Sequence, residues 1–124
     1  MATNPGRAAK MEWWATKEMI EKITRDLVAE FDPEEIILFG SQAWGEPNKH
    51  SDIDILVVVR GSSERPTKRM TRALHCTADV HFPKDILVAT PEELERQRKV
   101  PGTLIHQIFE EGQRLYEKPR SESS

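Results

Sequence analysis

The feature that most constrains the fold is a short apolar run at residues 53–59, in which Asp54 is the only polar residue. The β-branched residues of this run favour a strand, and its length is typical of a strand buried inside a sheet. The run is far too short to cross a bilayer, which takes about 20 apolar residues. We therefore expect a fold built around one buried strand with carboxylates at its start.

Two other short apolar runs also predict strands. Residues 36–40 are β-branched and end in glycine, although residues 32–35 (Asp-Pro-Glu-Glu) also look like a helix start. We interpret them as a proline turn followed by a buried strand. Residues 85–89 predict a third strand. Between the first two strands, glycine, proline and asparagine punctuate a loop over residues 40–51, with a helical turn expected near residues 42–44.

Amphipathic spacing and capping signals predict four longer helices. Apolar residues recur at spacings of three, four and seven over residues 12–31, and a short basic helix is expected at residues 67–76. The Thr-Pro-Glu-Glu sequence at residues 90–93 has the pattern of a capping box with proline at the first helical position. A last helix is expected at residues 104–111, ended by Gly112.

The order of these elements predicts a single small α/β (α+β) domain. A chain of 124 residues has room for one hydrophobic core. We expect a small mixed sheet of three or more strands, with helices packed mainly on one face. The domain is expected over residues 11–117, between a disordered lead-in at residues 1–10 and a disordered tail at residues 118–124.

Composition excludes several classes of function. A net charge of −3 argues against general DNA binding, which needs a basic surface. Cys76 is the only cysteine, which excludes an internal disulfide and a cysteine-rich zinc site. The first ten residues have no apolar segment behind them that would form a signal peptide, so we expect a cytoplasmic protein with no membrane contact.

The pair Asp52 and Asp54 is the main candidate for chemistry. Residues two apart on a strand point to the same side, with α-carbons about 6.6 Å apart. Two carboxylates on one side repel each other unless a cation lies between them, and oxygen ligands of this kind suit Mg²⁺ or Mn²⁺ with substrate phosphates. The simpler alternative is that both aspartates are solvated at a strand end.

Gly40 and Ser41 lie where a phosphate site would be expected. They end the preceding strand, and ten residues separate Ser41 from Asp52. A glycine–serine pair at a strand-to-helix turn offers free amides and a hydroxyl that can bind a triphosphate. Alone, the pair would be an ordinary turn; beside paired carboxylates it is a candidate nucleotide site.

Asp85 is the candidate third carboxylate. It starts the third strand as Asp52 and Asp54 start the second, and adjacent strands lie about 5 Å apart. It could help hold a second metal or accept the proton of an attacking hydroxyl. Asp79 is a weaker candidate for the same role, and Lys84 could pair with Asp85 or contact a phosphate.

Five basic residues between the second and third strands form a further patch. It could contact phosphates or an acidic partner, although a solvated helix face is the simpler interpretation. The five are Arg60, Arg65, Lys68, Arg69 and Arg72.

Two segments resemble the signature of the polymerase-β-like nucleotidyltransferases. They are residues 39–45 (Phe-Gly-Ser-Gln-Ala-Trp-Gly) and residues 51–57 (Ser-Asp-Ile-Asp-Ile-Leu-Val). Their Gly-Ser, ten residues, Asp-x-Asp spacing is similar to that of the minimal nucleotidyltransferase (MNT) group. Residues 85–94 and 108–116 are similar to that group's third strand with its following helix and to its closing segment.

The resemblance implies a nucleotidyltransferase fold and a role for each candidate residue. Gly40 and Ser41 would bind the phosphates of the nucleotide. Asp52 and Asp54 would hold Mg²⁺ or Mn²⁺, with Asp85 as the third metal-binding and catalytic carboxylate. ATP would be the substrate, although no residue of the sequence distinguishes one base from another.

The resemblance also implies a partner. MNT proteins are similar to the antitoxin half of two-gene toxin–antitoxin systems, whose toxin is a HEPN-domain ribonuclease. The expected reaction is transfer of AMP from ATP to a tyrosine hydroxyl on the toxin. Two alternatives stay open: a nucleotidyltransferase for a small molecule or an RNA end, and a non-catalytic module that neutralises its partner by contact. Association into a homo-oligomer also stays open.

Overall fold

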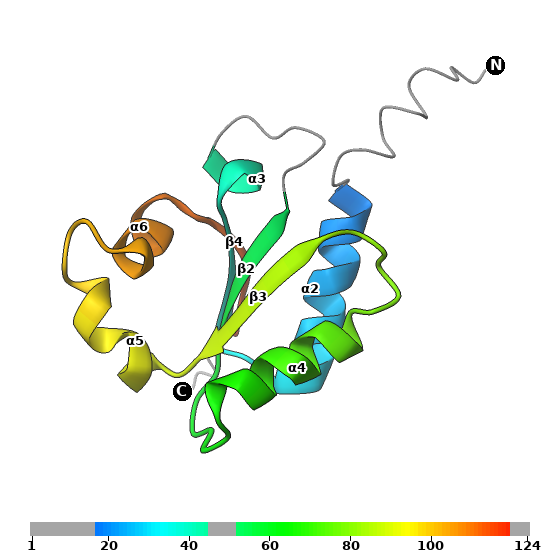
Figure 1. Cartoon of the computed structure of the whole chain (residues 1–124), viewed down its shortest axis with the longest axis horizontal. Helices are drawn as coiled ribbons and strands as arrows, with labels where there is room; N and C mark the ends of the chain where they lie inside the picture. The colour runs from blue at the N-terminus through cyan, green and yellow to red at the C-terminus, as the bar shows by residue number, and fades with distance from the viewer. Residues whose placement is uncertain (1–16, 45–51, 120–124) are drawn as a thin grey trace.

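A computed structural model describes residues 17–44 and 52–119 of the chain. The predicted lead-in and the tail beyond Pro119 lie outside the described residues, as does most of the loop before Asp52. None of the described helices is long and apolar enough to cross a membrane. The elements, in chain order, are α2 (Lys17–Phe31), β1 (Glu35–Phe39), α3 (Ser41–Trp44), β2 (Ile53–Val58), α4 (Pro66–Cys76), β3 (Lys84–Ala89), α5 (Pro91–Arg98), α6 (Leu104–Glu111) and β4 (Gln113–Glu117) (Figure 1).

The four described strands form one mixed sheet in the order β3-β2-β1-β4. β1 runs antiparallel to both β2 and β4, whereas β2 and β3 are parallel. This confirms the predicted small mixed sheet of an α/β domain. β4 was not predicted as a strand, because its sequence Gln-Arg-Leu-Tyr-Glu is largely polar and only its pairing with β1 makes it one.

Helices cover both faces of the sheet. The longer helices α2 and α4 pack on one face, and the shorter α5 and α6 pack on the other (Figure 1). Along β2, Ile55 and Val57 contribute to the core under α2 and α4, while Leu56 and Val58 contribute to the core under α5 and α6. The prediction of helices mainly on one face is corrected here, because a strand that is apolar on both sides needs cover on both.

The turn between α2 and β1 confirms the strand interpretation of the segment after Asp32. Asp32 has a positive φ of 47°, and its N–H donates to the carbonyl of Val28 at 3.0 Å, which ends the helix. Pro33 follows, and the N–H of Glu34 donates to the carbonyl of Val58 at 2.7 Å. The chain therefore enters the sheet directly rather than starting a new helix.

The predicted caps of α5 and α6 are also confirmed. The Thr90 hydroxyl accepts from the Glu93 N–H, and the Glu93 carboxylate accepts from the Thr90 N–H, which completes the capping box. α6 ends at Gly112, where an added Cβ would lie 2.5 Å from the Ile108 carbonyl oxygen and 2.6 Å from Cγ2 of Ile37. Glycine at this position lets the chain turn tightly against β1 and continue into β4.

Candidate active site

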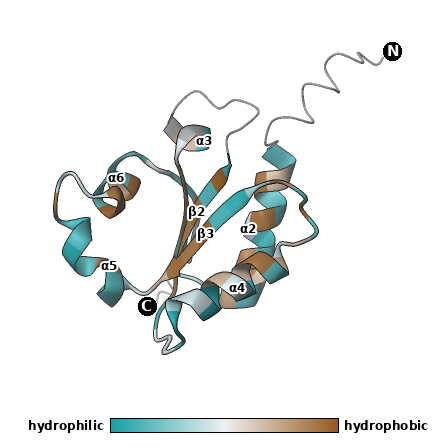
Figure 2. Ribbon diagram, in the orientation of Figure 1, coloured by the Kyte–Doolittle hydropathy of each residue, from teal (hydrophilic) through white to brown (hydrophobic). Residues whose placement is uncertain are grey.

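The predicted site residues meet at one end of the sheet. Because β1 is antiparallel to β2, the end of β1 lies beside the start of β2, and Phe39 is the pairing partner of Asp54. Because β2 and β3 are parallel, their starts lie side by side, and Asp54 is the pairing partner of Asp85. This end of the sheet is at the top in Figure 1. In Figure 2 the start of β3 is teal, which marks it as hydrophilic.

Asp54 and Asp85 lie on the same face of the sheet. Leu56 follows Asp54 by two residues and Leu87 follows Asp85 by two, and both leucines contact the core under α5 and α6. The two carboxylates therefore extend from this face at the end that the core does not fill. Asp52 directly precedes β2 and is exposed.

The electrostatics of Asp54 show that the three acids act on one another. Partial burial, followed by the negative charges of Asp85 and Asp52, raises the pKa of the Asp54 carboxyl from 3.8 to about 6. The two neighbouring charges that raise this pKa belong to the other two predicted site residues. A cation at this position would relieve the repulsion.

Gly40 lies directly against the Asp54 carboxylate. It follows β1 with a positive φ of 78°, and an added Cβ would overlap Oδ2 of Asp54. Glycine is thus required here both for its backbone conformation and for the space that the carboxylate occupies. Ser41 is the next residue and starts α3, so its backbone joins this end of the sheet; its side chain lies outside the described residues.

The donor set fits a hard divalent cation. Mg²⁺ is bound in proteins by one or two carboxylates, with waters and substrate phosphates completing its shell. The paired Asp54 and Asp85, with Asp52 nearby, supply oxygen ligands of this kind. Within residues 17–44 and 52–119, no three acidic, histidine or cysteine side chains are gathered closely enough to form a complete metal cage by themselves.

The structure separates Asp79 and Lys84 from this site. Asp79 pairs with Lys22 of α2 at 2.8 Å, on the opposite side of the sheet from Asp54 and Asp85. The Lys84 ammonium donates to the carbonyl of Val80 at 2.7 Å. Lys84 therefore does not pair with Asp85, which leaves the Asp85 carboxylate unmasked by its neighbour.

The predicted basic patch is largely a set of structural ion pairs. Arg69 is 1% exposed, and its guanidinium donates to Glu93 at 2.8 Å and to the Val88 carbonyl at 3.2 Å. Arg72 pairs with Glu30 and Glu64, and Arg60 pairs with Glu34 at 3.2 Å. The role of Arg69 was missed from the sequence because an arginine in a basic helix gives no local sign of burial, and its partner Glu93 is 24 residues later in the chain.

Comparison with known proteins places this site in a family. No curated protein matches the chain. Among solved structures, the chain is similar to a crystal structure of a candidate nucleotidyltransferase from Sulfolobus solfataricus, with 27% identity and a TM-score of 0.49 over 64% of this chain and 70% of that one. The family described as polymerase beta, nucleotidyltransferase matches residues 21–121, which include every candidate site residue. The chain therefore belongs to the polymerase beta nucleotidyltransferase family.

Proposed function

We propose that the chain is a Mg²⁺-dependent nucleotidyltransferase that transfers AMP from ATP to a hydroxyl of a partner protein, acting as the antitoxin of a HEPN ribonuclease. The observation that carries the transferase part is the pairing of Asp54 with Asp85 on one face of the sheet, directly beside Gly40. Family membership supports the same reaction type.

The chain's own residues have distinct tasks in this reaction. Asp85 accepts the proton of the acceptor hydroxyl, whose oxygen then forms a bond to the α-phosphorus of the nucleotide. The bond from the α-phosphorus to the bridging oxygen of the β-phosphate breaks, and pyrophosphate leaves with that oxygen. Gly40 and Ser41 bind and orient the triphosphate, and Asp52 and Asp54 would hold the metal.

When bound to Asp52 and Asp54, Mg²⁺ would offset the negative charge of the phosphate oxygens. The raised pKa of Asp54 supports this role, since its cause includes two neighbouring carboxylates that a cation would screen.

The partner part of the proposal rests on the MNT resemblance. Its support is the spacing of Gly40-Ser41, ten residues and Asp52-Ile53-Asp54, with the similar segments later in the chain. The neighbouring open reading frame, if it encodes a small helical protein with a HEPN ribonuclease motif, would supply the acceptor.

The test is a transfer assay with each of the four nucleoside triphosphates labelled at the α-phosphate, with Mg²⁺, in the presence and absence of the neighbouring gene product. We expect label from ATP on the partner protein. We expect Asp54→Asn and Asp85→Asn to abolish it. Asp79→Asn is the matched control, because Asp79 is an exposed acid that pairs with Lys22 away from the site, and it should keep full activity.

The outcomes separate the parts of the proposal. Label on RNA or on a small molecule instead of the partner would contradict the protein acceptor and leave the transferase standing. No label on any acceptor, together with tight binding of the partner, would contradict the transferase and favour neutralisation by contact.

A further inference from the structure

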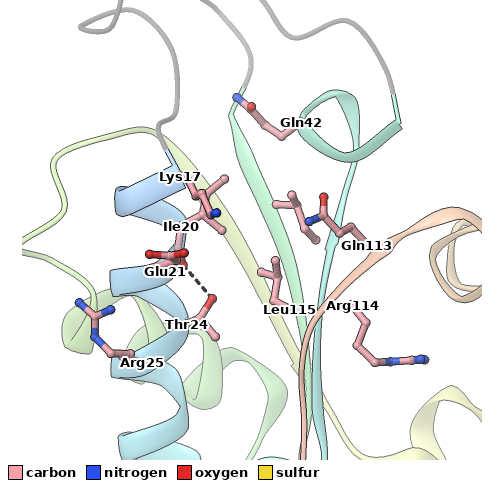
Figure 3. A pocket seen from close by; sticks show the side chains of 10 residues that line it. Lys17, Ile20, Glu21, Thr24, Arg25, Gln42, Gln113, Arg114 and Leu115 are labelled. Carbon is pink, nitrogen blue, oxygen red and sulfur yellow. Dashed lines mark hydrogen bonds between the residues drawn. The ribbon is translucent and has the colours of Figure 1, made fainter.

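A groove lies between α2 and β4, on the face of the sheet opposite the carboxylates. Its volume is about 570 Å³, and Leu38, a buried residue of β1, is among the residues that line it. Figure 3 shows the side chains of α2 and β4 that border it. Three charged residues of α2 border it at intervals of four: Lys17, Glu21 and Arg25. None of the three forms an ion pair with another described residue. The opposite border is β4.

β4 is an edge strand of the described sheet. Within the described sheet it pairs only with β1. Its residues are exposed or only partly buried along the whole strand. The outward N–H and C=O groups of such an edge are available to another strand.

A bulge determines which side chains of β4 share a face. Ile36 pairs with Tyr116 and Ile37 pairs with Arg114, so Leu115 is the extra residue. Leu115 and Tyr116 both contact the core on the α2 side. Arg114 instead pairs with Glu35 at 2.8 Å on the other face.

Glu117 shares the face of Arg114. It is the pairing partner of Glu35, so two carboxylates lie opposite each other on that face. Like charges directly opposite on neighbouring strands are destabilising. Among the described residues, Glu117 has no ion-pair partner, whereas Glu35 has Arg114.

We infer that this edge binds a second copy of the chain, with the two β4 strands antiparallel about a two-fold axis and Arg114 opposite the partner's Glu117. Because the bulge puts Leu115 and Tyr116 on the same face of β4, this register sets Leu115 opposite the partner's Tyr116 on the α2 side of the sheet. The two Arg114–Glu117 pairs form on the other side. The two sheets join into one of eight strands. The arrangement goes beyond the proposed function and does not depend on it.

The charges of α2 fit the same two-fold arrangement. An axis perpendicular to the sheet places both α2 helices on the same face of the joined sheet and antiparallel to each other. In two antiparallel copies of this helix, opposite charges face each other where Glu21 of one copy lies opposite the partner's Arg25.

The test is sedimentation velocity on the full chain at micromolar concentrations. The wild type should sediment with twice the monomer mass of 14.3 kDa. Arg114→Glu and Glu117→Arg should each weaken association at least tenfold, because each sets like charges opposite one another. An equimolar mixture of the two variants should form a heterodimer, in which every facing pair again has opposite charges.

The mixture distinguishes a lost interface from a damaged fold, since a misfolded variant would not regain a partner on mixing. Arg96→Glu, which reverses an exposed charge on α5, is the control and should sediment with the same dimer mass as the wild type. A wild type that remains monomeric would overturn the inference. So would single variants that still dimerise, or a mixture that stays monomeric.

Discussion

Asp54→Asn should make the metal-free protein more stable at pH 8. In the folded chain the pKa of Asp54 is raised from 3.8 to about 6, so its charged form is disfavoured there relative to the unfolded chain. One pKa unit corresponds to about 1.4 kcal/mol, so the full shift would be worth about 3 kcal/mol. Because the carboxylate remains in contact with solvent, screening reduces our expectation to about 1–2 kcal/mol.

The pH dependence has a definite sign. The stability associated with protonated Asp54 is fully present below pH 3.8 and is lost as the pH rises through about 6. The gain from Asp54→Asn should therefore be near zero at pH 4 and complete at pH 8. Asparagine has the same shape and cannot ionise, which isolates the charge.

Urea unfolding in EDTA, followed by circular dichroism at both pH values, measures this difference directly. Asp79→Asn serves as the control, because the pKa of Asp79 is lowered by its hydrogen bond to Lys22 and its replacement should not stabilise the protein. An Asp54→Asn variant that is no more stable than the wild type at pH 8 would refute the argument that the acids repel one another at this end of the sheet.

Three further substitutions test the local geometry, each by urea unfolding. Gly40→Ala should lower the free energy of unfolding by about 1–2 kcal/mol, because the new methyl group meets Asp54 and the backbone is left-handed; it should also abolish transfer, and full activity would contradict the contact. Gly112→Ala should cost about 1–3 kcal/mol, because its Cβ would overlap the Ile108 carbonyl; an unchanged midpoint would show that α6 can move away. Arg69→Met should cost about 2–3 kcal/mol through lost charged hydrogen bonds, and a neutral result would mean that the buried guanidinium is dispensable.

The sequence predicted correctly those features of the fold that depend on residues close together in the chain. The apolar run behind Asp54, the capping box at Thr90 and the stop at Gly112 each depend on neighbouring residues, and the structure confirms all three. The placement of Asp54 beside Asp85 also followed from the sequence, because both residues start predicted strands.

Long-range pairing could not be obtained in the same way. β4 is a strand because its backbone pairs with β1. Its largely polar sequence has no apolar alternation that would predict a strand. The burial of Arg69 depends on Glu93, 24 residues later in the chain. The close approach of Gly40 to the Asp54 carboxylate likewise requires the register between β1 and β2.

The proposed site for a nucleoside triphosphate and a divalent cation lies where β1, β2 and β3 meet. Its most direct test is an NMR titration of the ¹⁵N-labelled full chain with Mn²⁺ and a non-hydrolysable ATP analogue, which broadens amide signals close to the metal. We expect the strongest broadening at Gly40, Asp54 and Asp85, its loss in Asp54→Asn, and weaker effects at Asp79. Broadening centred on Asp79, or none at the end of β1 and the starts of β2 and β3, would contradict it.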